Sequence, residues 1–208
     1  MRLPQLVSLG LSALCLLNFA WSIQRVFIWP TTLHSLTKAT LALGSLFGLM
    51  QLVAIASFAS EISFSWGFGI GLFCLALIVF RMAVAASVSI APRLAFSNSR
   101  PRRIIVRGPY SLVRHPCYLA YLCYWMGGLL VSRWLPLLVG VLVMGSLYVV
   151  AAMREEREFL SGPLATQYDE YRLQTGMFWP RISLLEVKKG IVGGSKAISV
   201  TVTRIFAG

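Results

Sequence analysis

The sequence predicts an all-α, polytopic membrane protein with about five transmembrane helices. Of its 208 residues 57% are hydrophobic and only 12% are charged, and long apolar runs recur along most of the chain. A soluble domain carries about 25% charged residues, so this chain has too few polar side chains to cover a surface that faces water. The composition excludes disordered chains, secreted disulfide scaffolds and nucleic-acid-binding domains.

Five apolar runs are the predicted spans, and they cover residues 3–28, 39–60, 64–88, 117–131 and 135–153. A span needs roughly 20 residues at about 1.5 Å of rise each. The fourth run is shorter, so we expect its helix to begin a few residues earlier. Three regions follow: N-terminal membrane helices over 1–92, a core of linker, helical hairpin and cap helix over 93–182, and a basic tail over 183–208.

The positive charge predicts the orientation. The chain has 19 Lys and Arg against 7 Asp and Glu, a net charge of +12. Basic residues concentrate in the linker between the third and fourth runs and in the segment after the fifth. Because cytoplasmic segments are enriched in Lys and Arg, we expect the N-terminus outside and the C-terminus in the cytoplasm. The charge is thereby explained without a nucleic-acid partner.

Polar and charged residues are concentrated in two segments of the chain. The linker ends in RRIIVRGPYSLVRHPCYLAY, and the fifth run continues without a break into MREEREFL. The turn between the last two runs is short, so their helices are antiparallel neighbours. His115 and Glu155 each lie about 20 residues from that turn, or roughly 30 Å along a helix. The spacing therefore predicts that His115, Tyr118, Arg154 and Glu155 meet at one depth, at the cytoplasmic membrane surface.

A short cap helix is expected after this cluster. Gly162-Pro163 interrupts the preceding helix, and Leu164, Tyr168 and Tyr171 then recur with helical spacing. Gly176 is the expected C-cap of this helix. The aromatic residues that follow it suit the lipid headgroup layer.

These segments resemble a known family. RGPYSLVRHPCYLAY, followed after one membrane hairpin by REEREFL and YDEYRLQTGMFWP, is similar to the C-terminal half of integral-membrane methyltransferases. That group contains the isoprenylcysteine carboxyl methyltransferases and the related phospholipid methyltransferases. The resemblance covers about 80 residues, and two features depart from it: Ala120 replaces the glycine expected after RHPxYx, and SGPLATQ differs from the usual segment before the tyrosines.

The resemblance implies that S-adenosylmethionine is the cofactor and that it binds near the cytoplasmic surface. It also implies that Arg154 is the catalytic residue, which faces the substrate. The implied cofactor-binding residues are Arg102, Arg103, Ile104, Ile105, Tyr110, His115, Pro116, Cys117, Tyr118, Glu155 and Glu156.

The methyl acceptor is expected to be a lipophilic molecule that enters from the bilayer. A carboxylate is already ionised at pH 7 and needs no base, and Arg154 can hold it with two hydrogen bonds. This favours carboxyl O-methylation of a prenylcysteine-like substrate. A phospholipid amine or a small thiol remains an alternative acceptor. Two further alternatives are an NADPH-dependent membrane reductase of the sterol type, whose members usually carry Asn at the position of Cys117, and a non-catalytic membrane subunit.

Overall fold

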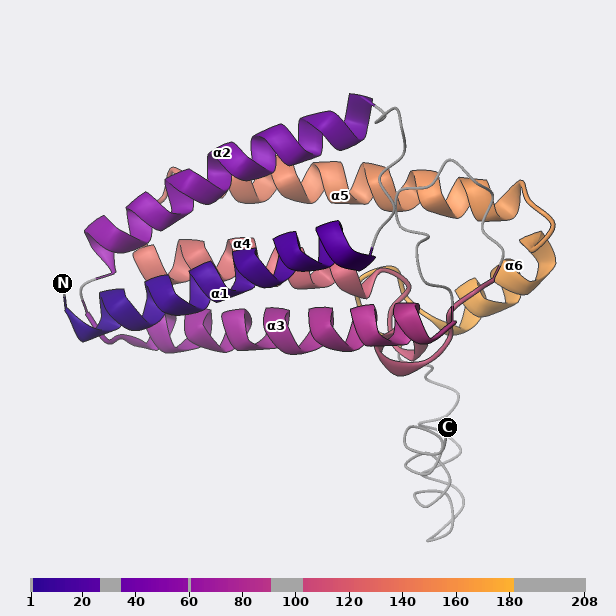
Figure 1. Cartoon of the computed structure of the whole chain (residues 1–208), viewed down its shortest axis with the longest axis horizontal. Helices are drawn as coiled ribbons and strands as arrows, with labels where there is room; N and C mark the ends of the chain where they lie inside the picture. The colour runs from indigo at the N-terminus through magenta and orange to yellow at the C-terminus, as the bar shows by residue number, and fades with distance from the viewer. Residues whose placement is uncertain (1, 27–34, 60, 91–102, 182–208) are drawn as a thin grey trace, which may run out of the picture.

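The computed structural model describes residues 2–26, 35–59, 61–90 and 103–181, and these ranges are helical apart from short connections (Figure 1). The helices are α1 (Leu3–Val26), α2 (Ser35–Phe58), α3 (Phe64–Ile90), the 3-10 helix η1 (Gly108–Ser111), α4 (Pro116–Ser132), α5 (Leu137–Leu160) and α6 (Ala165–Gln174). Within this part of the chain, β pairing is limited to a single bridge between Val113 and Gly176. The predicted basic tail over 183–208 lies outside the described residues.

Four of these helices are long and apolar enough to cross a membrane, over Leu3–Ser22, Ser35–Phe58, Phe64–Val88 and Leu137–Leu160. The expectation of an all-α membrane protein is confirmed. The remaining predicted span, the fourth apolar run, corresponds to α4, which has 17 residues. At 1.5 Å per residue α4 is about 25 Å long, somewhat shorter than the hydrocarbon layer.

The short helix α4 lies at the centre of the bundle. It packs against α1, α2, α3 and α5, and its closest association is with α3. Nine of its residues are buried, among them Tyr124, Trp125 and Gly128.

Glycines allow α3 and α4 to approach closely. A Cβ atom added to Gly69 would lie 2.8 Å from the carbonyl oxygen of Gly127, and one added to Gly127 would lie 3.0 Å from the carbonyl oxygen of Gly69. Close approach of backbones at small residues is typical of helix packing in membranes. The side chain of Gln51 fills the space beside Gly128 and donates to the carbonyl oxygen of Tyr124 at 3.4 Å.

The loop between α4 and α5 is short, as predicted, and α4 begins at Pro116, one residue before the apolar run. His115 precedes the helix as its N-cap residue, and Pro116 occupies the first turn, where its missing N–H is not needed. The turn at Gly108-Pro109 is also present, with Gly108 in the left-handed region at φ 59°. Arg133, with φ 54°, ends α4.

The cap helix α6 is present, but the expected cap at Gly176 is wrong. The helix ends at Gln174, and Thr175 is its C-cap in an extended conformation. Gly176 instead pairs with Val113 and sits so close to the carbonyl of Trp179 that any side chain would collide with it. A glycine is therefore required at position 176, in the tight turn that follows α6.

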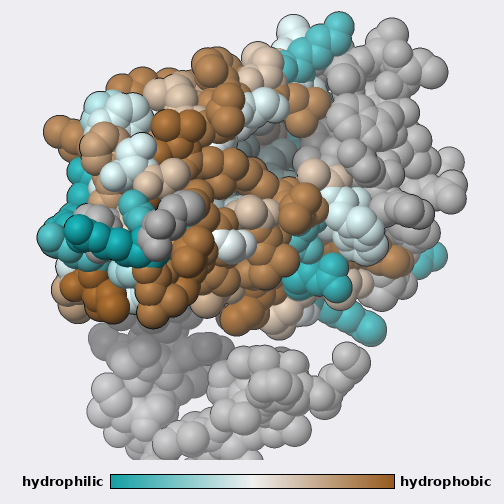
Figure 2. Space-filling view, turned by 60° about the vertical axis from the view of Figure 1, so that its left-hand side comes forward, coloured by the Kyte–Doolittle hydropathy of each residue, from teal (hydrophilic) through white to brown (hydrophobic). Residues whose placement is uncertain are grey.

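The outer surface of the bundle is apolar. Figure 2 shows large hydrophobic areas over the visible helices, with hydrophilic residues gathered toward the ends. Exposed leucines such as Leu17, Leu46 and Leu49 project from α1 and α2. An apolar exterior of this kind is expected for helices that face lipid.

Candidate functional site

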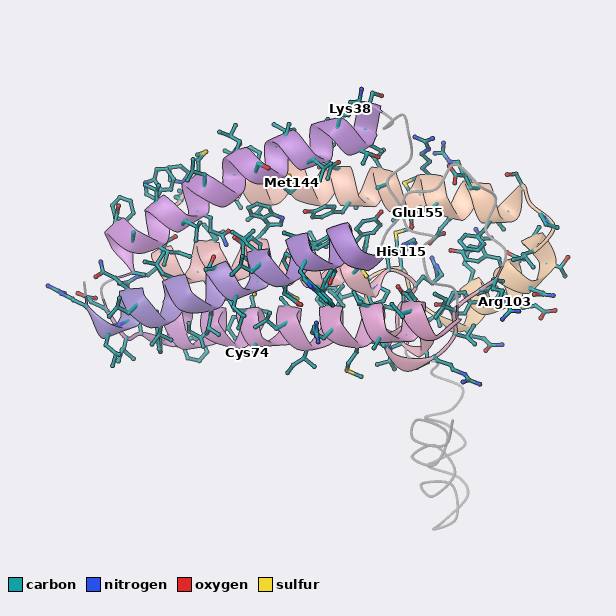
Figure 3. All side chains as sticks on the ribbon, viewed as in Figure 1. Lys38, Cys74, Arg103, His115, Met144 and Glu155 are labelled. Atoms are coloured by element: carbon teal, nitrogen blue, oxygen red, sulfur yellow. The ribbon has the colours of Figure 1, made fainter. Side chains whose placement is uncertain are left out.

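The segments predicted to converge do so at one end of the bundle, where α1 and α3 end and α4 begins (Figure 1). There, His115 Nδ1 lies 3.6 Å from Glu155 Oε2, and the Tyr118 hydroxyl donates to Glu155 Oε1 at 2.5 Å. Figure 3 shows His115 and Glu155 facing each other between α5 and the start of α4. The side chain of His115 is buried, whereas that of Glu155 is 43% exposed. Glu155 is therefore accessible to a ligand.

The neighbouring carboxylate, Glu156, points to a different environment. It is 9% exposed, and its Oε1 accepts hydrogen bonds from Arg114 Nε at 2.8 Å and from His115 Nε2 at 3.1 Å. Both of these hydrogen-bond donors come from the segment that directly precedes α4. The carboxylate of Glu156 is thus enclosed by other groups of the protein, whereas part of the Glu155 carboxylate remains accessible.

Arg114 also fastens the end of α6. Its Nη1 donates to the carbonyl oxygen of Thr175 and, at 3.4 Å, to that of Arg172. The backbone N–H groups of Arg114 and His115 donate to the carbonyl oxygens of Gly176 and Met177. The Arg114 side chain, which is 10% exposed, therefore joins the segment before α4, the end of α5 and the end of α6.

Tyr110 brings η1 to the same cluster. Its hydroxyl lies 3.1 Å from Ser87 Oγ and 3.9 Å from Cys117 Sγ, and its carbonyl oxygen accepts from the Tyr171 hydroxyl at 2.6 Å. Burial raises the pKa of Tyr110, and the nearby charge of Glu155 adds to the rise. The phenol is therefore neutral at physiological pH and can act as a hydrogen-bond donor.

A stack of aromatic rings leads from the cluster into the bundle. Tyr118 stacks on His115 at 5.7 Å between ring centroids and on Tyr148 at 5.6 Å. Tyr121 lies 5.4 Å from Tyr148, whose hydroxyl accepts from Trp125 Nε1 at 3.0 Å. Faces of aromatic rings attract cations, so this wall suits a positively charged group beside Glu155.

The charge state of His115 follows from its surroundings. Burial lowers the pKa of His115, but hydrogen bonds and charge interactions with Glu155 and Glu156 outweigh burial, so the pKa is raised above 6.5. Both ring nitrogens face carboxylate oxygens, an arrangement that fits an imidazolium with two N–H donors. In this protonated form His115 has no free ring nitrogen to accept a proton.

The remaining predicted residues are placed less centrally. Arg102 lies outside the described residues, Arg103 is exposed, and Ile104 and Ile105 are half-buried; Pro116 is fully buried. Arg154 adjoins Glu155 in sequence, but its Nε donates to Glu158 Oε1 at 3.2 Å, one turn further along α5. The roles assigned to these residues stay predictions.

Sequence reasoning missed Arg114 and Tyr148. Arg114 stands directly before His115 in the quoted motif, but it was assigned only to the positive charge of the linker. A signal existed, because an arginine beside a buried histidine and opposite a pair of glutamates has obvious ionic partners. Tyr148 carries no comparable sequence signal, since it lies inside an apolar run.

Comparison with known proteins identifies the family. The family model described as phospholipid methyltransferase matches residues 64–166, about half of the chain. The matched range contains α3, η1, α4 and α5 and ends within α6. The chain belongs to this family, which is part of the group of integral-membrane methyltransferases that its motifs resemble. No curated protein is significantly similar to the chain.

Membership establishes the class of activity. The protein is an integral-membrane methyltransferase and an enzyme, which favours this class over the sterol-type reductase and the non-catalytic subunit. The match begins at α3, earlier than the motifs that carry the resemblance, and so includes a membrane helix that those motifs do not cover.

We expect Arg114→Ala to destabilise the protein severely, because it removes the arginine partner of the buried Glu156 carboxylate, a loss of about 3–5 kcal/mol. The measurement is the midpoint of thermal unfolding in detergent, with limited proteolysis to detect release of α6. Arg172→Ala is the control, since it breaks only an exposed pair with Asp169, worth about 1 kcal/mol or less. Equal effects of the two substitutions would contradict the conclusion that the Arg114 side chain holds the segment before α4, α5 and α6 together.

The raised pKa of His115 predicts a pH dependence of stability. The imidazolium contributes its full stabilisation below pH 6.5, where it is protonated in both the folded and unfolded chain, and the contribution is lost as pH rises through the higher pKa of the folded state. The unfolding midpoint should therefore fall as pH is raised above 6.5. His115→Gln should flatten this dependence, and an identical pH profile in the variant would exclude the imidazolium as its source.

Proposed function

We propose that this protein transfers a methyl group from S-adenosylmethionine to the carboxylate of a lipophilic, prenylcysteine-like acceptor. The observation that carries the proposal is the cluster of His115, Tyr118 and the accessible carboxylate Glu155 at one end of a membrane bundle. Membership of a methyltransferase family supports the donor. The acceptor is inferred from the charges of the site.

The residues present suit this cofactor. Glu155 offers a half-exposed carboxylate to an ammonium or to ribose hydroxyls. The faces of Tyr118 and Tyr148 suit a sulfonium cation, and Tyr110 can donate a hydrogen bond. When bound, S-adenosylmethionine supplies the methyl group on its sulfonium, and transfer to a carboxylate yields an ester and S-adenosylhomocysteine.

The protonation of His115 favours a carboxylate acceptor. An amine is protonated at pH 7 and must lose a proton before it can attack, whereas a carboxylate is ready to react. The pKa of His115, raised by Glu155 and Glu156, favours the imidazolium, which has no free ring nitrogen to take a proton from an amine. The protein then acts mainly by holding two reactants in line, which can supply a large part of a rate enhancement.

Arg154 is the residue we propose to hold the acceptor. Its ion pair with Glu158 joins side chains that are 40% and 50% exposed, and pairs of this kind contribute little to stability. Arg154 can therefore exchange Glu158 for a substrate carboxylate at small cost. Its guanidinium offers two parallel N–H donors that match a carboxylate.

We place the site in the cytoplasmic leaflet, with the N-terminus outside, because basic residues flank the site end of the bundle. The N-terminus lies at the opposite end of the bundle from His115 (Figures 1 and 3). The acceptor would approach from the bilayer, since the apolar outer surface of the helices adjoins the end of the bundle that holds the cluster. The cap helix α6 would shield the cofactor from water.

A phospholipid amine is the second candidate acceptor. The description of the matching family model favours it. A small thiol, the other acceptor considered from the sequence, also requires a base.

Glu155→Gln and His115→Ala should each weaken binding of S-adenosylhomocysteine by about ten-fold or more, because each removes a charged group that faces the ligand. Isothermal titration calorimetry in detergent measures this affinity. Glu158→Gln is the matched control, since it changes an exposed glutamate on the same helix. If both site variants bind as the unmodified protein does, the cofactor site lies elsewhere.

The acceptor is tested by incorporation of radiolabelled methyl groups from S-adenosylmethionine into acetylated farnesylcysteine or phosphatidylethanolamine. We expect labelling of the carboxylate compound. Arg154→Ala should lower kcat/KM for it by about ten-fold or more while affinity for S-adenosylhomocysteine is kept. Arg157→Ala serves as control. Labelling of phosphatidylethanolamine alone would overturn the carboxylate assignment and leave the methyltransferase intact.

A further inference from the structure

Arg81 is a charged residue in the middle of a lipid-facing surface. It lies in α3, nine residues before the helix ends at Ile90, and its side chain is exposed. Ile78 and Met82 beside it are 57% and 51% exposed. On the adjoining helix α1, Leu17 is 68% exposed. Arg81 therefore projects between two apolar rows that face the bilayer.

The contacts of Arg81 hold the guanidinium without neutralising it. Its Nη1 lies 3.5 Å from Asn18 Oδ1, and its central carbon lies 5.6 Å from the ring centroid of Trp21. Neither partner is an anion, and no carboxylate within the described residues forms an ion pair with Arg81. The cation still requires a counter-charge, because an unpaired arginine among lipid chains is costly.

The depth of Arg81 indicates where that counter-charge comes from. The preceding residue, Phe80, packs on Tyr121 with ring centroids 5.5 Å apart. Tyr121 lies six residues after His115, or about 9 Å along α4 from the site. An arginine side chain can extend over such a distance toward the headgroups, and Trp21, 49% exposed, is of the type that occupies this layer.

We propose that Arg81, oriented by Asn18 and Trp21, binds the phosphodiester group of a membrane phospholipid. The lipid lies on the outer face formed by α1 and α3, in the leaflet that borders the His115–Glu155 cluster. The planar guanidinium keeps N–H donors for two phosphate oxygens after its contact with Asn18. Phe19 and Phe80, 4.7 Å apart between centroids, separate this lipid from the aromatic stack of the site.

Native mass spectrometry of the full chain, released from detergent after titration with one lipid at a time, tests this proposal. The probes are phosphatidylglycerol, phosphatidylcholine and a diacylglycerol with the same acyl chains. Arg81→Gln should lower the affinity for both phospholipids by about ten-fold and leave that for diacylglycerol unchanged, because only the first two carry a phosphate. Arg81→Lys keeps the charge but lacks the paired N–H donors of the guanidinium, so it should give a smaller loss of phospholipid affinity.

Arg107→Gln is the matched control, because it removes an exposed arginine outside the spans and changes the net charge equally. Arg81→Gln should also keep the thermal unfolding midpoint of the unmodified protein in detergent, which establishes that the variant is folded and makes this test independent of the proposed function. Equal phospholipid affinities in Arg81→Gln and Arg107→Gln would overturn the proposal. So would an equal loss for diacylglycerol, because Arg81 would then act through packing.

Discussion

The ion pair between Arg114 and Glu156 is the constraint on which the functional end of the molecule depends. The two side chains are 10% and 9% exposed, and they join segments 42 residues apart. Two charges removed from water are stable only if hydrogen bonds satisfy their remaining donors and acceptors. His115 and the carbonyl oxygens at the end of α6 supply those bonds. The pair thereby fixes the relative positions of α5, α6 and the start of α4.

This constraint leaves one of two adjacent carboxylates available for chemistry. On a helix, neighbouring residues point about 100° apart, so Glu155 and Glu156 cannot face the same partners. Glu156 turns to Arg114, and Glu155 remains 43% exposed beside Tyr118. A charge ladder results, in which Arg114, Glu156, His115 and Glu155 alternate in sign when His115 is protonated. Such a ladder holds its members rigidly while presenting a carboxylate at its accessible end.

The meeting of His115, Tyr118 and Glu155 was predictable from the sequence because it depends only on helix rise and a short turn. His115 and Glu155 lie at similar distances from the turn along the two helices, so they match in depth. Which carboxylate faces which partner was not predictable, since that depends on helix rotation. The pairing of Arg154 with Glu158 has the same origin. The central place of α4 depends on contacts such as Gly69 with Gly127, which are far apart in sequence.

The central proposal is that the cluster around His115 and Glu155 binds S-adenosylmethionine. The most direct test is calorimetric titration of the unmodified protein in detergent at pH 7 with S-adenosylhomocysteine, with NADPH in a parallel experiment. We expect saturable binding of S-adenosylhomocysteine and no binding of NADPH. Binding of NADPH alone, or of neither compound, would contradict it.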